Sequence, residues 1–419
     1  MRKMRDSGIE WVGAIPQDWQ LSKIGSLYMQ RNEKVSDKDY QPLSVTMQGI
    51  LPQLATAAKT DDGDNRKLVR VGDFAINSRS DRRGSCGISP LDGSVSLINI
   101  ILTPRTAMHP GYYNWLFHTT LFADEFYKWG HGIVADLWTT RWQEMRSITV
   151  PVPEYAEQER IAAFLDAECA EIDTVLEKTR ASIEEYKKLK QAIITQAVTK
   201  GIRGDRPMKD SGIEWIGDIP AEWDVIRVKQ LLKERNERSK EGKEEPLSMS
   251  QKVGLVPTKF LESIPNMASS FVGAKLAYVD DLVFNKLKAH LGVFSVSRYD
   301  GLVSPDYAVY CSTGKSNLKY LEYIFKTPQC IGEFRKKSTG IAAGLMRLYT
   351  EGLFSIYLPY PALSEQEEIA EYLNEKCADI DALIAKKQQY LTEIENYKKS
   401  LIYEYVTGKK EVKTSVLAD

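Results

Sequence analysis

The stretch DSGIEWVGAIPQDW (Asp6–Trp19) recurs 204 residues later as DSGIEWIGDIPAEW (Asp210–Trp223). Between Asp6–Glu33 and Asp210–Glu237, 14 of 28 aligned positions are identical. After a few inserted residues the offset becomes 208, and it persists to the segments PVPEYAEQERIA and PYPALSEQEEIA. Identity over such a length indicates a tandem duplication, so the chain consists of one module of about 205 residues present twice.

Each module begins with about 150 residues of mixed character. Short β-branched runs, such as SVSLINIIL (Ser94–Leu102) and LAYVDDLVF (Leu276–Phe284), are separated by Gly, Pro, Asn and Asp. This pattern is typical of short strands joined by turns. Apolar spacing also indicates helix around Tyr113–Trp129 and Leu318–Lys336. A strand-rich globular head is therefore predicted at the start of each module.

The second part of each module is helical. Residues 154–200 and 362–407 contain neither Gly nor Pro, and their apolar residues recur at alternating spacings of four and three. That spacing is the pattern of a coiled-coil seam, in which Cys169 and Cys377 take equivalent positions. A helix of about 45 residues is about 65–70 Å long, more than a head is wide, so an ordinary core helix is the weaker interpretation. We expect the two helices to pack on each other in antiparallel orientation.

The ends of these helices carry sequence signals of their own. Ser364 and Glu367 form a capping-box pattern that predicts the start of the second helix. Gly201 and Gly408 are natural stops.

The expected fold class is α+β, a tandem duplication of a mixed, strand-rich domain followed by a long α-helix. The two helices form an antiparallel coiled coil with pseudo-two-fold symmetry. The predicted domains are head 1 at 1–153, helical spacer 1 at 154–202, head 2 at 203–361, and helical spacer 2 with the tail at 362–419.

Two loops differ between the heads although the residues around them are retained. NSRSDRRG (Asn77–Gly84) aligns with NKLKAHLG (Asn285–Gly292), and residues 132–141 align with residues 340–349. Two similar heads on a rigid spacer suit a repetitive, rod-shaped target such as duplex DNA, and such loops carry donors that bind guanine and phosphate edges. Solvated surface charge remains the alternative for any single residue. The candidate DNA-binding residues are Asn77, Ser78, Arg79, Arg82, Arg83, His131, Thr139, Arg141, Asn285, Lys286, Lys288, His290, Lys337 and Arg347.

Three repeated motifs resemble one protein family. They are SGIEWIG-x-IPxxW, the PVP/PYP-x₃-EQxxIA entry to each helix, and the VTKG/VTGK helix end. Together they closely resemble the specificity subunits of bacterial type I restriction–modification systems, and the resemblance covers essentially the whole chain. The resemblance implies two target-recognition domains, each reading one half of a bipartite, asymmetric DNA site. It also implies that the paired helices fix the gap and dock two methyltransferase subunits, through which restriction subunits join.

No catalytic or metal site is expected in the chain itself. The acidic-or-amide-Pro-Pro-aromatic motif of adenine methyltransferases and a P-loop are both missing, and the four histidines have no metal-ligand spacing. We therefore expect no cofactor and a non-catalytic subunit. The resemblance implies that S-adenosylmethionine, ATP and Mg belong to the partner subunits. It also implies that the holoenzyme is an adenine-specific DNA methyltransferase and ATP-dependent endonuclease.

Charge and composition permit this interpretation without demonstrating it. The net charge is −1, but residues 1–153 carry 18 basic and 16 acidic side chains, and residues 207–360 carry 21 and 18. Five scattered cysteines, no apolar signal segment and no membrane span predict a cytoplasmic protein. Two alternatives stay open: a protein-interaction scaffold with incidental DNA binding, and an enzyme whose motifs have diverged.

Overall fold

The computed structural model describes residues 2–54, 62–132, 138–251, 253–261, 270–340 and 346–413. The chain forms two compact units. Unit 1 comprises Met1–Arg180 with Gln388–Asp419, and unit 2 comprises Ala181–Lys387. Each unit therefore holds one head and one segment of each long helix.

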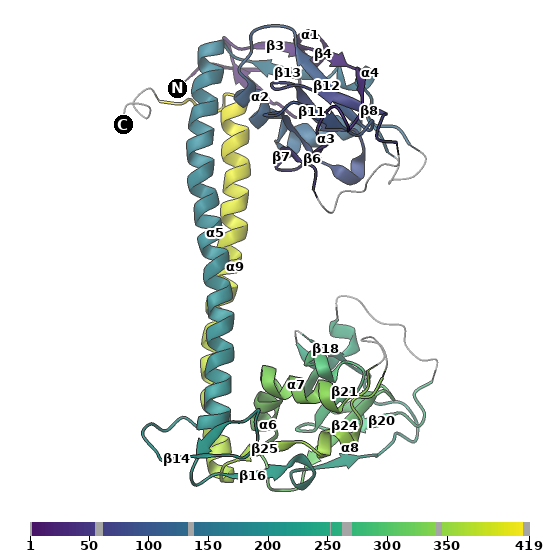
Figure 1. The fold of residues 1–419 in the computed structure, drawn as a ribbon, viewed down its shortest axis with the longest axis vertical. Coiled ribbons are helices and arrows are strands. Elements are labelled where there is room, and N and C mark those ends of the chain that lie inside the picture. The colour runs from purple at the N-terminus through teal and green to yellow at the C-terminus, as the bar shows by residue number, and fades with distance from the viewer. Residues whose placement is uncertain are drawn as a thin grey trace. The chain divides into compact units, whose positions relative to one another are not determined.

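Head 1 alternates short strands with short helices (Figure 1). Its elements are β1 (Met4–Asp6), β2 (Ala14–Pro16), β3 (Gln20–Lys23), α1 (Ile24–Leu27), β4 (Tyr28–Arg31), β5 (Lys34–Val35), β6 (Leu43–Thr46), β7 (Gly49–Pro52), β8 (Arg66–Val69), β9 (Phe74–Asn77), the 3-10 helix η1 (Ser80–Arg82), β10 (Cys86–Ile88), β11 (Gly93–Val95), β12 (Asn99–Pro104), α2 (Pro110–Phe117), α3 (Thr120–Lys128), α4 (Trp142–Met145) and β13 (Thr149–Val152).

Head 2 repeats this order with small variations. Its elements are β14 (Met208–Asp210), β15 (Asp218–Pro220), β16 (Asp224–Arg227), η3 (Val228–Gln230), β17 (Leu232–Arg235), β18 (Leu247–Ser250), β19 (Gly254–Pro257), η4 (Thr258–Phe260), β20 (Lys275–Ala277), β21 (Leu282–Asn285), η5 (Ala289–Leu291), β22 (Phe294–Val296), β23 (Gly301–Val303), β24 (Tyr307–Ser312), α6 (Leu318–Phe325), α7 (Pro328–Lys337), α8 (Thr350–Phe354) and β25 (Tyr357–Tyr360).

The main sheet has the same topology in both heads. Its four antiparallel strands run in the order β10-β9-β12-β4 in head 1 and β22-β21-β24-β17 in head 2. The hairpin β6-β7 corresponds to β18-β19, and the pair β13-β3 corresponds to β25-β16. The shared topology confirms the predicted duplication of a mixed domain.

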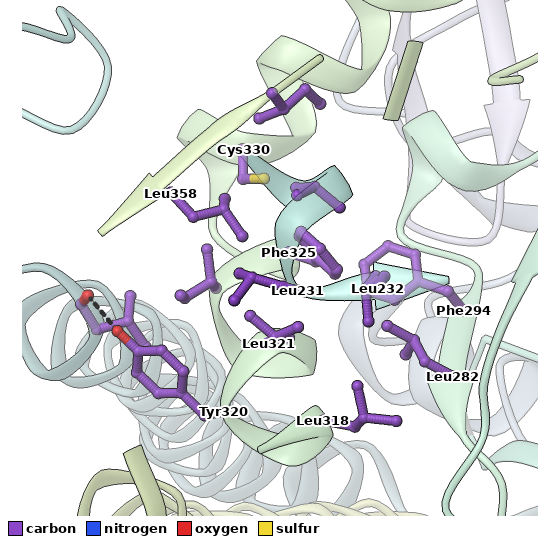
Figure 2. Packing of buried hydrophobic residues seen from close by; sticks show 14 of the residues in the cluster. Leu231, Leu232, Leu282, Phe294, Leu318, Tyr320, Leu321, Phe325, Cys330 and Leu358 are labelled. Atoms are coloured by element: carbon purple, nitrogen blue, oxygen red, sulfur yellow. Dashed lines mark hydrogen bonds between the residues drawn. The ribbon is translucent and has the colours of Figure 1, made fainter. Parts of the chain in front are cut away.

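The core of each head lies between this sheet and its helices. In head 1, Phe74 of the sheet contacts Phe117 of α2, with ring centroids 4.5 Å apart. In head 2, Figure 2 shows Leu282 and Phe294 of the sheet facing Phe325 and Leu321 of α6. Each head thus buries an extended apolar face, which is the main source of its stability.

The helix expected after the sheet is split in both heads. Thr119 and Thr327 are N-caps, and their side chains accept hydrogen bonds from Phe122 N and Cys330 N. The caps end one helix and begin the next, α2–α3 in head 1 and α6–α7 in head 2.

Two long helices follow the heads, α5 (Tyr155–Lys200) and α9 (Leu363–Val406). In unit 1 they lie side by side, and Lys398 Nζ is 2.6 Å from Asp173 while Arg180 Nη2 is 2.6 Å from Glu395 (Figure 1). In unit 2, Lys190 Nζ is 2.6 Å from Asp381. Because α9 numbers fall as α5 numbers rise in unit 1, the predicted antiparallel pairing is confirmed there.

Of the predictions made for the long helices, the one about the seam is confirmed and the one about the start of the second helix is wrong. Cys169 and Cys377 are both buried, as their seam positions predict. The capping box at Ser364 is wrong, because Ala362 is the residue before the helix and its carbonyl accepts from Gln366 N. Among the described residues, no helix combines the length and apolarity needed to cross a bilayer.

Candidate nucleic-acid interface

The repeated tryptophans belong to a junction between head and helix. In unit 1, Trp19 Nε1 donates to Glu157 Oε2 at 2.9 Å, and Arg2 pairs with both Glu157 and Asp18. The hydrogen bond that Arg2 donates to Glu157 is the main cause of the raised pKa of Arg2. The Arg2 guanidinium also lies over the Trp19 ring, 5.4 Å from its centroid. The first motif is thereby fixed to the start of α5.

Unit 2 repeats this junction residue for residue. Trp223 Nε1 donates to Glu365 Oε2 at 2.9 Å, and Arg206 pairs with Glu365 at 2.7 Å and with Glu222 at 3.0 Å. The Arg206 guanidinium lies 5.1 Å from the Trp223 ring centroid. Glu365 and Arg206 are almost fully buried, so each needs the other as a partner.

A glutamine at the start of each long helix makes the second connection. Gln158 donates to the Pro153 carbonyl at 2.9 Å and accepts from His109 N, the residue before α2. Gln366 donates to the Pro361 carbonyl at 3.0 Å and accepts from Asn317 N, the residue before α6. The repeated Glu-Gln pair of the second motif thus holds the short helix of the head against the long helix.

A tyrosine of each head donates a hydrogen bond to the third motif. Tyr112 Oη donates to the Val406 carbonyl at 2.9 Å, and Tyr320 Oη donates to the Val198 carbonyl at 3.3 Å. Figure 2 shows Tyr320 pointing toward α5, where the dashed line marks this bond. The residues that carry the family resemblance therefore build the junction between head and helix.

The two loops that diverge between the heads lie next to each other in head 1. Thr140 N donates to the Ser78 carbonyl and Ser80 N donates to the Trp138 carbonyl, both at 3.0 Å. His131 and Thr139 exchange two backbone hydrogen bonds of 3.0 Å. Residues 133–137, part of the second candidate loop, lie outside the described residues.

Head 2 joins its two loops in the same way. Leu348 N donates to the Lys286 carbonyl at 3.0 Å, and Thr339 and Arg347 exchange backbone hydrogen bonds of 3.0 and 2.8 Å. Residues 341–345 of this loop also lie outside the described residues. In each head the structure therefore brings together the two segments that the repeat comparison selected.

Candidates in head 1 divide into framework and surface residues. Asn77 and Ser78 are buried; Asn77 Oδ1 accepts from Arg79 N, and Ser78 Oγ donates to the Ile98 carbonyl. Thr139 is half-buried. The exposed candidates are Arg79, Arg82, Arg83, His131 and Arg141.

Two adjoining hollows lie beside these exposed residues. The larger, of about 610 Å³, is lined by Arg79, Arg82 and Arg83 together with the buried Arg66. The smaller, of about 380 Å³, is lined by Arg79, Arg141 and Lys67, among others. Sequence comparison missed Arg66 and Lys67. One signal for Lys67 was available in the sequence, because the 208-residue offset aligns it with Lys275 and both heads therefore retain a lysine at this position.

Candidates in head 2 are less accessible. Lys288 and Lys337 are exposed, whereas Lys286 is half-buried and donates to the Pro305 carbonyl at 3.2 Å. Burial lowers the pKa of Lys286. Arg347 lies 3.5 Å from Asp306.

Two further candidates of head 2 belong to its framework. Asn285 Oδ1 accepts from Leu287 N at 3.1 Å, which matches the role of Asn77. His290 is buried, and burial lowers its pKa, with Arg335 adding to the effect. Arg335 and Lys336, beside the candidate Lys337 at the end of α7, are basic residues that sequence comparison did not select. Contact of the fourteen candidates with DNA stays a prediction.

The glycines of these loops are required by backbone conformation or by close packing. Gly84 and Gly292, aligned by the 208-residue offset, both have φ of +77°, a conformation that side chains disfavour. At Gly130 an added Cβ would overlap the Trp138 ring, whose Nε1 donates to the Tyr127 carbonyl. Packing therefore accounts for Gly130. Over the part of the chain that the structure describes, no cluster of His, Cys, Asp and Glu is arranged for a metal ion.

Comparison with known proteins agrees with this architecture. No protein-family profile matches the chain. The type I restriction enzyme MjaVIII specificity subunit of Methanocaldococcus jannaschii is 23% identical over 429 aligned residues, covering 95% of this chain and 94% of that protein. The HsdS subunit of Thermoanaerobacter tengcongensis has a solved structure with a TM-score of 0.54 and 15% identity, covering 94% of this chain and 98% of that one.

A second solved chain is similar in fold. It comes from a study of complex assembly and conformational transition in a type I restriction–modification system, and it has a TM-score of 0.72 and 13% identity. The match covers 94% of this chain and 99% of the solved chain. The fold is thus shared with these two solved structures. The similarity to type I restriction enzyme specificity subunits agrees with the resemblance of the three repeated motifs.

Proposed function

We propose that the chain is the sequence-specific DNA-binding subunit of a type I restriction–modification complex, in which each head reads one half of a bipartite, asymmetric site. One observation carries this proposal. The two heads share topology and junctions, yet the loops Asn77–Gly84 and Asn285–Gly292 differ at all six positions between their retained Asn and Gly. A retained framework with altered donors is what reading two different half-sites requires.

The partners in this proposal are double-stranded DNA and two methyltransferase subunits, with restriction subunits joining through the latter. Exposed apolar residues on the long helices support docking. Unit 1 exposes Tyr390 and Tyr397 on α9, and unit 2 exposes Leu189 on α5 and Leu383 on α9. In this proposal the partner subunits bind S-adenosylmethionine, ATP and Mg, and this chain holds no cofactor of its own.

Binding experiments test the proposal directly. The complex with its methyltransferase subunits is mixed with duplexes that contain or lack the site mapped from methylated adenines in the host genome. We expect a sequence-dependent shift that weakens as salt rises, because phosphate contacts release counterions. The purified chain alone is expected to transfer no methyl groups. Equal binding to all duplexes would instead favour a protein scaffold, and methyl transfer by the chain alone would favour an enzyme.

The spacer role has its own test. Inserting four residues into each long helix adds about 6 Å of helix. We expect the recognised gap to lengthen by about one or two base pairs, at about 3.4 Å per pair, while both half-sites keep their sequence. The measurement is the methylated-adenine map of cells that carry the altered subunit. An unchanged gap would contradict the spacer role.

A further inference from the structure

The two heads differ most in where they carry arginine. Arg79, Arg82 and Arg141 of head 1 align, at the 208-residue offset, with Leu287, His290 and Tyr349 of head 2. All three arginines are exposed, whereas His290 is buried. Every guanidinium at these positions is therefore lost in head 2.

These guanidiniums are also weakly engaged within the protein. Among the described residues, the side chains of Arg79 and Arg141 form no hydrogen bond or ion pair. Arg82 has one long ion pair, at 3.7 Å, with its sequence neighbour Asp81. Arg83, in contrast, pairs with Asp124 of α3. A guanidinium without a protein partner keeps all five of its donors for a ligand.

Arg79 has the central position among them. It lines both hollows of head 1, while Arg82 lines only the larger and Arg141 only the smaller. The backbone of Arg79 is fixed, because its N–H donates to Asn77 Oδ1 and its segment is joined to Thr139 by a β-bridge. A side chain held at its base and unpaired at its tip is suited to bidentate recognition.

Head 2 has a hollow at the corresponding place with a different lining. Leu247, Ser248, Ser304 and Tyr307 line it, and these align with Leu43, Ser44, Ser96 and Asn99 in the larger hollow of head 1. The other described lining residues of this hollow, about 430 Å³ in volume, include Phe271 and Pro305 and no charged side chain.

We propose that the half-site read by head 1 contains guanine, whose O6 and N7 accept from Arg79 in the major groove, with Arg82 and Arg141 on either side. Head 2 reads its half-site without a guanidinium at these three positions. Arginine matches the paired acceptors of guanine, and no other base presents two acceptors on its major-groove edge. The inference rests on the proposed function and specifies the base chemistry of one half-site.

The test uses the complex with its methyltransferase subunits and the mapped site. Replacing residues 21–153 with the head of another family member identifies which half-site belongs to head 1. Guanines in one half-site at a time are then replaced by 7-deazaguanine, which lacks the N7 acceptor. We expect affinity to fall about 5- to 150-fold for the half-site of head 1, the range for one lost bidentate contact, and far less for the other half-site.

An Arg79→Lys variant separates bidentate contact from charge. It keeps the positive charge, so we expect it to bind the unmodified duplex about as weakly as wild type binds the 7-deazaguanine duplex, and to lose sensitivity to that substitution. Arg70→Ala is the matched control, because Arg70 is an exposed arginine of the same head that pairs with Asp92 outside both hollows. It should bind as wild type does.

The outcomes distinguish the two levels of the proposal. Absence of any sequence-specific binding overturns the proposed function. Specific binding to a head 1 half-site that has no guanine, or that tolerates 7-deazaguanine in the wild-type complex, overturns only the role of Arg79. The wild-type arm requires no variant, so misfolding of Arg79→Lys would leave the inference testable.

Discussion

The junctions of the two units and their loop regions have diverged to very different extents. Trp19, Glu157 and Arg2 make the same contacts in unit 1 as Trp223, Glu365 and Arg206 make in unit 2. The neighbouring loops keep only their backbone pairing, and their exposed side chains differ. Both modules therefore retain the contacts that hold head and helix together, whereas residues that face solvent in the loops were free to change. The contacts that maintain the fold are thus distinct from the exposed loop residues that we propose set specificity.

Breaking the shared junction should have the largest effect on stability. Glu365→Ala leaves Arg206 and the Trp223 indole without their buried acceptor, so we expect a loss of about 3–5 kcal/mol in the free energy of unfolding. Glu157→Ala should cost a comparable amount in unit 1. Urea unfolding of the full chain measures both.

Glu368→Ala provides the matched control for this pair of variants. Glu368 pairs with Arg203 on the surface, so its loss should cost less than about 1 kcal/mol. Equal effects of Glu365→Ala and Glu368→Ala would contradict the role given to the junction.

Removing one hydroxyl at the third motif should have an intermediate effect. Tyr320→Phe takes the donor from the Val198 carbonyl, and Tyr112→Phe takes it from the Val406 carbonyl. We expect each to lose about 1–2 kcal/mol, since a buried hydrogen bond contributes about that much. Thermal unfolding of the two variants sharpens the comparison, because junctions that are truly equivalent must respond alike. Tyr323→Phe, whose hydroxyl donates to Asn374 at an exposed position, should have a smaller effect.

The smallest expected effect is a difference in pH response at aligned positions. Burial lowers the pKa of His290, so the folded state binds its proton less readily than the unfolded state. Stability from this group is present above the ordinary histidine pKa of about 6.5 and is lost as pH falls below that value. His290→Gln should flatten this part of the profile, as measured by urea unfolding at several pH values between about 5 and 7.5. The aligned Arg82 does not titrate there, so Arg82→Gln should leave the profile unchanged.

Some details of the fold were not predictable from local sequence signals. The Ser364 pattern indicated a capping box, but α9 begins so that Ser364 lies in its first turn. Gln366 instead makes the useful contacts, with the Pro361 carbonyl and with Asn317 N. A partner in another element decided the geometry there, and a local pattern contains no information about that partner.

Sequence by itself determined the duplication, the strand-rich heads, the two long helices and the loops that diverge. The duplication is visible directly as a repeated sequence, and the strands and helices follow from apolar periodicity, which is local along the chain. Only tertiary structure joined Tyr112 to Val406, 294 residues away, paired the two loops of each head, and separated exposed Arg79 from buried His290. Burial and hydrogen-bond partners depend on which segments pack together, so Arg82 is exposed in head 1 while His290, its aligned residue, is buried in head 2.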